Sequence, residues 1–333
     1  EMDIEDLIPV EDCVITLTSG GYVKRQTLDS YRTQRRGGRG ISGLARKDED
    51  FVDHLFVCST HDYILFFTNR GRMYRLKGYE IAESSRAGRG SHIVNLLPIE
   101  KEEKITAAIR VGEVDEESFL VMVTGQGTIK RTELSAYKNI RKAGLIAINL
   151  DEGDELAWVL NTSGRDELIV ATAQGMAIRF AETDLRPMSR TAMGVRAVRL
   201  GENDHVVGMV KAEENGLLLT VTESGLGRRS RVEDYRLQSR GGKGIRNYDT
   251  QEKGTLVAAV RAVRDGEDVI LISDDGVIIR IPAEQINIQS RYAGGVRVMR
   301  IGEGGRVVSV ENVPRDEEEA GTGEVPEEEH QGE

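Results

Sequence analysis

Short runs of apolar and β-branched residues recur along the chain six times, at intervals of about 50 residues. Runs of this kind, bounded by turn signals, predict strands. Each run is followed by Thr or Ser three residues before a glycine, a spacing typical of hairpin turns because the hydroxyl bonds local backbone and glycine tolerates positive φ. A second strand follows each turn directly. The predicted first strands are residues 14–17, 63–67, 119–123, 168–171, 217–221 and 269–272.

The turns and the strands after them share one register in all six copies. The turn glycines are Gly21, Gly71, Gly127, Gly175, Gly225 and Gly276. Four residues later every copy carries an arginine, at Arg25, Arg75, Arg131, Arg179, Arg229 and Arg280. Two interpretations stay open. The arginines blunt a strand edge and cover apolar surface with their stems, or they form a ring of positive charge around the molecule.

The second half of each repeat adds an apolar residue, a basic loop and two more short strands divided by an acidic turn. The apolar residues, expected in the core, are Tyr31, Tyr79, Tyr137, Leu185, Tyr235 and Ile286, with Tyr79 two residues early in its copy. Four strands per repeat indicate a propeller blade, and such a repeat must pack against its neighbours. We expect one all-β domain over residues 13–313, with blades at about 13–61, 62–117, 118–166, 167–215, 216–266 and 267–313.

Charge is distributed unevenly along the chain. The formal net charge is -11, but residues 316–333 hold nine acids and residues 1–12 hold six, with no Lys or Arg in either segment. The repeats between them carry 45 basic and 41 acidic residues. We therefore expect an acidic linker over residues 1–12, joined to a missing N-terminal part because the chain opens with Glu1, and a disordered acidic tail over residues 314–333.

The loops carry the most specific signal. The first reads Gln34-Arg35-Arg36-Gly37-Gly38-Arg39-Gly40, in which glycines let backbone N–H groups and guanidinium forks approach a phosphate together. As a bare string it is equally typical of a flexible linker, but the same slot recurs in the other copies. There it supplies the cations Arg86, Arg89, Arg141, Lys142, Arg190, Arg240, Lys243 and Arg291.

The loop at residues 34–40 resembles the seven-residue box, Q-R-R-G-G-(K or R)-G, that marks the C-terminal domain of DNA gyrase A. The resemblance extends over the six repeats, the degenerate boxes and the acidic tail. It implies a six-bladed β-pinwheel whose blades exchange outer strands and whose basic rim wraps double-stranded DNA, with the loop and strand cations above as the DNA-binding residues. It also implies that the box closes the ring, that the wrap is positive in hand, and that the tail competes with DNA. The third repeat departs from the pattern, with Ile140 in place of the loop arginine and a loop two residues shorter.

The same resemblance implies the wider assembly. Gyrase A joins gyrase B in an A2B2 holoenzyme in the bacterial cytoplasm, at the nucleoid, and wrapping directs strand passage toward ATP-dependent negative supercoiling. The cleaving tyrosine and the ATP and Mg sites belong to parts outside this chain, so we expect no cofactor here and a monomeric isolated domain. Contacts between the rim cations and DNA would reach the phosphate backbone rather than the bases, so we expect weak sequence preference.

Other classes remain as alternatives. The related C-terminal domain of topoisomerase IV has a similar repeat but lacks an intact box. A protein-binding propeller predicts chemical variety on one face, and a propeller enzyme predicts polar residues converging on the central channel. No P-loop or CxxC occurs and no run is long enough to span a membrane, so we expect no metal site, no catalytic residue and no membrane contact. Cys13 and Cys58 are too few for a disulfide framework.

Overall fold

The predicted hairpins form in all six repeats of the computed structural model, which describes residues 3–28, 52–85, 87–111, 117–275 and 277–315. In the first hairpin the amide of Gly21 donates to the Thr18 carbonyl at 3.0 Å, and the amide of Tyr22 donates to Thr18 Oγ1 at 3.1 Å. Gly21 has a φ of 87°, which glycine adopts without strain. The Thr before each of the five described turn glycines therefore closes the turn, as its spacing predicts.

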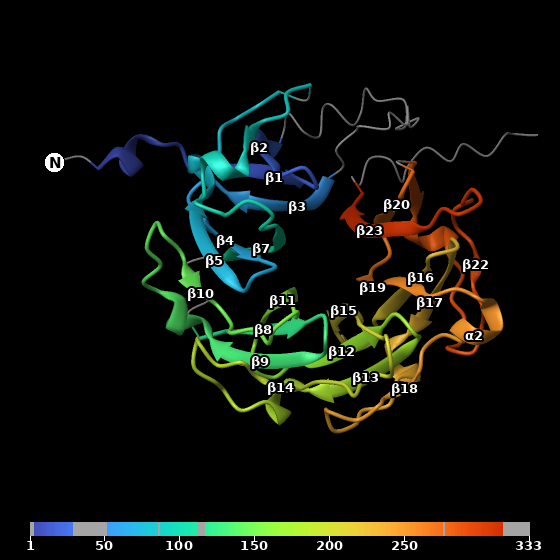
Figure 1. Ribbon diagram of the computed structural model, residues 1–333. Coiled ribbons are helices and arrows are strands. Elements are labelled where there is room, and N and C mark those ends of the chain that lie inside the picture. The colour runs from blue at the N-terminus through green and yellow to red at the C-terminus, as the bar shows by residue number, and fades with distance from the viewer. Residues whose placement is uncertain (1–2, 29–51, 86, 112–116, 276, 316–333) are drawn as a thin grey trace, which may run out of the picture.

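The first three blades are four-stranded antiparallel sheets (Figure 1). Blade one is ordered β3-β1-β2-β6, with β1 Asp12–Thr18, β2 Tyr22–Thr27, β3 Val52–Ser59 and β6 Ser91–His92. Blade two is ordered β7-β4-β5-β10, with β4 Tyr63–Thr68, β5 Arg72–Lys77, β7 Ile105–Val111 and β10 Leu145–Ile146. Blade three is ordered β11-β8-β9-β14, with β8 Phe119–Thr124, β9 Thr128–Glu133, β11 Leu156–Thr162 and β14 Val195–Arg196.

The remaining blades repeat this order. Blade four is ordered β15-β12-β13-β18, with β12 Glu167–Thr172, β13 Met176–Ala181, β15 Val206–Lys211 and β18 Ile245–Arg246. Blade five is ordered β19-β16-β17-β22, with β16 Leu217–Thr222, β17 Leu226–Arg231, β19 Val257–Val263 and β22 Val296–Arg297. Blade six, in its described part, is ordered β23-β20-β21, with β20 Glu267–Ser273, β21 Ile278–Pro282 and β23 Val307–Pro314.

The outermost strand of each of the first five blades comes from the following repeat. Strand β6 of the second repeat pairs with β2 of blade one, placing His92 opposite Tyr22 and Ser91 opposite Val23. The same exchange brings β10 to β5, β14 to β9, β18 to β13 and β22 to β17. Each of these repeats thus gives one strand to complete its neighbour's sheet.

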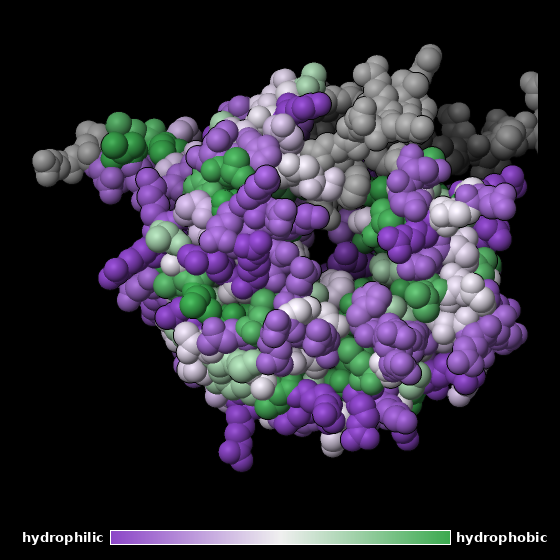
Figure 2. Space-filling view, viewed as in Figure 1, coloured by the Kyte–Doolittle hydropathy of each residue, from purple (hydrophilic) through white to green (hydrophobic). Residues whose placement is uncertain are grey.

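The innermost strands contact one another in sequence around a common centre. They follow the order β3, β7, β11, β15, β19 and β23, and β23 in turn contacts β3. Figure 1 shows the six blades arranged in a ring, and Figure 2 shows the disc hollowed at its middle. The exchanged strands lie on the opposite side of each sheet from these inner strands. The outer edge of the disc is therefore built from β6, β10, β14, β18 and β22 and the loops that lead into them.

The core lies between the blades. Five clusters of buried residues each join two neighbouring blades; in the first, Ile15 and Leu17 of blade one pack with Phe66 and Tyr74 of blade two. Apolar burial stabilises by roughly 25 cal/mol per Å², so each such interface contributes several kcal/mol. A repeat without a neighbour would leave one face of its sheet exposed, as the repeat pattern predicts.

Four of the six predicted core residues occupy these interfaces. Tyr137, Leu185, Tyr235 and Ile286 are buried, and Tyr31 lies outside the described residues. Tyr79 was expected in the core and is not: it is half-buried against the His61 ring. Ile81, ten residues after Gly71 and therefore at the register of the other copies, is fully buried in its place.

Most of the core residues follow a short 3-10 turn that ends the second hairpin strand. These turns are η2 Gly78–Glu80, η4 Leu134–Tyr137, η5 Glu182–Asp184, η6 Val232–Asp234 and η7 Ala283–Gln285. The other short helices are η1 Ile4–Leu7, η3 Ile93–Asn95 and α2 Thr250–Lys253.

The predicted acidic linker is folded where it is described. Glu5, in η1, pairs with Lys77 of blade two at 3.1 Å, and Thr60 Oγ1 donates to the Pro9 carbonyl at 2.8 Å. Asp12 already belongs to β1. Residues 3–11 therefore lie against blades one and two, and Glu5 pairs with a cation of blade two. The acidic segment 316–333 lies outside the described residues, and its disorder and its competition with DNA stay predictions.

Candidate nucleic-acid interface

The basic loops lead directly into the exchanged strands, which places them at the outer edge of the disc. Arg89 precedes β6, Arg141 and Lys142 precede β10, Arg190 precedes β14, Arg240 and Lys243 precede β18, and Arg291 precedes β22. Figure 2 shows hydrophilic side chains projecting along this margin, beneath β14 and β18 in the view of Figure 1. The structure therefore gathers the described loop cations on one surface, the rim.

The rim cations differ in how far they reach into solvent. Arg89, Arg141, Lys142 and Lys243 are exposed. Arg190, Arg240 and Arg291 are half-buried because each guanidinium also bonds the neighbouring loop. Gln34, Arg35, Arg36, Gly37, Gly38, Arg39, Gly40 and Arg86 lie outside the described residues, so their role stays a prediction.

The three half-buried arginines link successive loops along the rim. Arg190 donates to the Ile146 carbonyl at the end of β10 at 2.8 Å, and Arg240 donates to the Arg196 carbonyl at the end of β14 at 2.9 Å. Arg291 makes the same bond to the Arg246 carbonyl at the end of β18. One nitrogen of each guanidinium is held in place this way, so the side chain has a defined direction along the rim.

Three further arginines on the rim were not singled out from the sequence. Arg196, Arg246 and Arg297 are the second residues of β14, β18 and β22, and all three are exposed. They share a recognisable signal, since each follows the loop glycine and one β-branched residue, as in Gly194-Val195-Arg196. A search that continued the register past the loop glycine would have found them.

The strand arginines of the first five blades, by contrast, contact the next blade. Arg25 Nε donates to the Ile81 carbonyl at 2.9 Å, Arg179 Nη1 to the Tyr235 carbonyl at 3.0 Å, and Arg229 Nε to the Ile286 carbonyl at 2.7 Å. Ile81, Tyr235 and Ile286 are the buried apolar residues of the following repeats. These guanidiniums therefore join blade to blade beneath the rim, and each satisfies a main-chain acceptor.

The strand arginines also contact acidic residues and aromatic rings. Arg131 pairs with Glu182 at 3.3 Å, Arg179 with Glu167 at 2.5 Å and Arg229 with Asp265 at 3.0 Å. The Arg75 guanidinium lies 4.3 Å from the centre of the Tyr63 ring and also donates to the Lys138 carbonyl.

Burial separates two strand arginines from the surface. Arg131 is 7 % exposed and Arg229 5 %. A phosphate would find little of either guanidinium in this structure. The contacts therefore support a blade-joining role, which the sequence did not predict. The DNA role that the sequence predicts for the strand arginines stays untested; these are Arg25, Arg75, Arg131, Arg179, Arg229 and Arg280.

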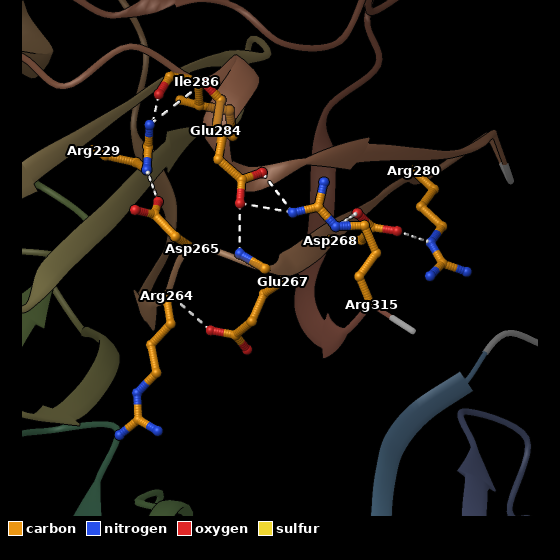
Figure 3. Close-up of polar contacts among 10 residues, drawn as sticks. Arg229, Arg264, Asp265, Glu267, Asp268, Arg280, Glu284, Ile286 and Arg315 are labelled. Carbon is orange, nitrogen blue, oxygen red and sulfur yellow. Dashed lines mark hydrogen bonds and ion pairs between the residues drawn. The ribbon is translucent and has the colours of Figure 1, made fainter. Parts of the chain in front are cut away.

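Arg280 of blade six lies in a polar network at the edge of its sheet (Figure 3). Its Nε donates to Asp268 Oδ2 at 2.6 Å, while Arg315 contacts the other Asp268 oxygen at 3.4 Å, so the two cations flank one carboxylate. Arg315 also pairs with Glu284 at 2.6 Å. This network ties Arg315, which directly precedes the acidic segment 316–333, to blade six.

The described part of the chain also bears on the expectations for metal ligands, membrane-spanning helices and cysteines. No group of three or more His, Cys, Asp or Glu residues there could hold a metal ion. No described helix is long and apolar enough to cross a membrane. Cys13 and Cys58 are buried free thiols whose sulfurs lie 3.7 Å apart across β1 and β3.

The fold and rim together define a six-bladed β-propeller with exchanged outer strands and cations along its outer edge. A family model described as the DNA gyrase C-terminal domain, beta-propeller, matches residues 14–59, 62–111, 118–163, 166–213, 216–262 and 267–314, one block per blade. The chain belongs to this family.

Relatives and solved structures agree with that assignment. The chain is 54% identical over 325 residues to DNA gyrase A of Halalkalibacterium halodurans and 49% identical over 319 residues to that of Clostridium acetobutylicum. These matches cover 98% and 96% of this chain but only 39% and 38% of the relatives, so the chain spans less than half of their length.

Two solved structures share the fold. The C-terminal domain of DNA topoisomerase IV superimposes with a TM-score of 0.78 at 28% identity, covering 92% of this chain and 94% of that one. The DNA gyrase A C-terminal domain superimposes with a TM-score of 0.73 at 27% identity, covering 91% of this chain and 99% of that one.

Proposed function

We propose that this domain binds double-stranded DNA without sequence specificity and bends it around the rim. The observation that carries the proposal is the repetition of exposed cations on successive exchanged strands: Arg196, Arg246 and Arg297 hold one register on three neighbouring blades. The loop cations Arg89, Arg141, Lys142 and Lys243 extend the same surface. A duplex that follows this edge would meet cations on one blade after another.

The energetics of bending favour such an arrangement. DNA has a persistence length of about 50 nm, and a bend of about 40 to 90° costs roughly 1 to 6 kcal/mol. Most of a turn costs several times more. Neutralising about 6 to 10 phosphates releases counterions and provides an affinity that falls steeply with salt. Contacts spread over successive blades can therefore offset a bend that a single site could not hold.

The contacts that the rim offers are to phosphate and not to base edges. In the described residues the rim presents two-residue strands and loops, and no helix of a length that would fill a major groove. Phosphate contacts fix position but carry no sequence information. Weak sequence preference follows.

Within the longer protein, we propose that wrapping directs strand passage toward ATP-dependent negative supercoiling. The support is the family assignment and the identity to DNA gyrase A. On this proposal the chain is a non-catalytic, monomeric domain that needs no cofactor. The cleaving tyrosine and the ATP and Mg sites would lie elsewhere in an A2B2 assembly with gyrase B, in the bacterial cytoplasm at the nucleoid.

A second candidate is the corresponding domain of topoisomerase IV. The TM-score to that domain is 0.78, against 0.73 to the gyrase A domain, so the fold alone does not separate the two. The 49% and 54% identities to DNA gyrase A and the intact sequence Gln34-Arg35-Arg36-Gly37-Gly38-Arg39-Gly40 favour gyrase.

Duplex binding across a salt series tests the proposal. Replacing Arg196, Arg246 and Arg297 by Ala should reduce the slope of log affinity against log salt by about three, since each lost phosphate contact lowers it by about one. The matched control replaces the exposed arginines Arg70, Arg165 and Arg264, which lie between strands and outside the basic loops. A protein-binding propeller would show no salt-dependent duplex binding. If both variants had the same slope of log affinity against log salt, the DNA would not bind at the rim.

A further inference from the structure

Three cations, two of them fully buried, lie beneath the rim at one register of the second hairpin strand. Lys24, Lys130 and Arg228 each stand one residue before the strand arginine, in blades one, three and five. Lys130 and Arg228 have no exposed surface, and Lys24 is partly buried. Charged side chains are seldom buried unless they bind something, so each of these three requires a partner.

Each of the three donates to main-chain carbonyls of the next repeat's basic loop, and Arg228 Nη2 also donates to the carbonyl of Asn247 in its own repeat. Lys130 Nζ donates to the Ser189 carbonyl at 3.4 Å and to the Arg190 carbonyl. Arg228 donates through Nε to the Ser290 carbonyl at 3.1 Å and through Nη2 to the Arg291 carbonyl at 2.8 Å.

Lys24 repeats the arrangement in blade one. Its Nζ donates to the carbonyls of Ser85 and Gly88, both at 3.3 Å. Ser85, Ser189 and Ser290 hold the same place, five residues before the loop glycine. Three cations of the same register therefore bind three loops at the same register.

The blade itself does not require a cation at this position. Tyr74, Ile178 and Ile279 occupy the register in blades two, four and six, and the hairpins there form equally well. Burial, together with the nearby charge of Arg190, lowers the pKa of Lys130 to about 7. Burial also lowers the pKa of Arg228. An apolar residue is sufficient for folding at this register, and a buried cation there costs free energy. The cation therefore indicates a role other than stabilising the blade.

We propose that Lys24, Lys130 and Arg228 are positioning residues that hold the rim loops of repeats two, four and six in the conformation that contacts DNA. By bonding the loop carbonyls from beneath, each cation fixes the loop backbone from which Arg89, Arg190 or Arg291 reaches the rim. A loop fixed before binding loses less conformational entropy when a phosphate arrives. The inference rests on the proposed DNA binding and explains how the rim loops are ordered before the duplex binds.

The test compares Lys130→Met with Lys130→Arg in the 333-residue chain, with Ile178→Met as the matched control at the same register. Lys130→Met should weaken duplex binding by about three- to tenfold, because the loop would then have to be ordered when the duplex binds. Lys130→Arg should restore binding to within about twofold, because Arg228 already serves at this register in blade five. Ile178→Met should bind as the unaltered chain does.

Two further measurements separate positioning from folding. Amide exchange should quicken over residues 189–194 in Lys130→Met and return in Lys130→Arg. The Tm of Lys130→Met should not fall below that of the unaltered chain at about pH 6, where burying the protonated amine is costly. Unchanged affinity and unchanged loop exchange in Lys130→Met would overturn the inference, as would a fall in Tm that accounts for the lost affinity. If the unaltered chain itself binds no duplex, the proposed function is wrong. Amide exchange over residues 189–194 would still show whether Lys130 orders the loop.

Discussion

Arg131 and Arg141 show, at the scale of single residues, how two cations of the same repeat differ in surroundings. Arg141 is exposed on the rim, whereas the Arg131 guanidinium lies 4.4 Å from the centre of the Phe119 ring and pairs with Glu182. Glu182 is itself fully buried and accepts hydrogen bonds from Thr162 Oγ1 and the Asp166 amide, both at 2.8 Å. The pair is part of a polar network between blades.

Removing one member of that pair should destabilise the fold. Arg131→Met leaves the Glu182 carboxylate buried without its cation, so the free energy of unfolding should fall by about 3 to 5 kcal/mol. Urea unfolding measures this change. Adding Glu182→Gln should recover part of the loss, since the remaining side chain is then neutral.

The rim residue provides the control. Arg141→Met should leave the unfolding free energy within about 0.5 kcal/mol and weaken duplex binding instead. If Arg131→Met kept full stability but lost DNA affinity, the blade-joining assignment of the strand arginines would be wrong.

Residue-scale features were only partly predictable from the sequence. The register located the strand arginines, but spacing along a strand does not reveal whether a guanidinium meets solvent or the next blade's carbonyls. Tyr79 shows the same limit: its aromatic ring suggested the core, whereas the spacing repeated within the chain pointed to Ile81. Lys130 and Arg228 were missed because their acceptors are main-chain atoms, which leave no mark in the sequence.

At the scale of elements, the exchanged strands depend on a glycine that lets two chain segments approach closely. Gly244 has a φ of 76°, and a Cβ there would overlap the Ala177 carbonyl oxygen of β13. The following residues form β18, which pairs with β13 through Ala177 and Met176. A side chain at this position would therefore push the exchanged strand off its neighbour.

Gly244→Ala should lower the free energy of unfolding by about 3 kcal/mol or more, combining the positive φ with the overlap. Gly153→Ala is the matched control, since Gly153 has a φ of 77° and nothing within 4 Å of its would-be Cβ. That change should cost only about 1 to 2 kcal/mol. Equal losses in thermal or urea unfolding would mean that the close approach does not matter.

The strands themselves were largely predictable, whereas their partners were not. The β-rich runs and turn glycines predict all six hairpins. The two short runs after each basic loop bring the predicted strands to four per repeat. The outer strand has two residues, too few to show a period of two, so nothing in the pattern assigns it to the neighbouring sheet. The resemblance to the gyrase domain implied the exchange, and the pairing of Arg196 with Thr128 is one instance of it.

At the scale of the whole molecule, the overall charge hides the surface that matters. The net charge is -11, yet residues 316–333 alone hold nine acids, and the rim carries cations on successive blades. A curved basic edge attracts DNA locally even when the total charge is negative, because fields are screened over about 8 to 10 Å at physiological salt. On the proposed function, the ring of six blades would convert a repeated phosphate contact into a curved path for the DNA.

The most direct test of DNA wrapping is the change in linking number when the chain binds relaxed circular DNA that is then sealed by ligase. A duplex curled around the rim with a fixed hand should shift the topoisomer distribution in one direction, in proportion to the protein bound, and the shift should diminish as salt weakens phosphate contacts. A distribution that stays centred on the relaxed form, under conditions where the duplex is bound, would contradict the account.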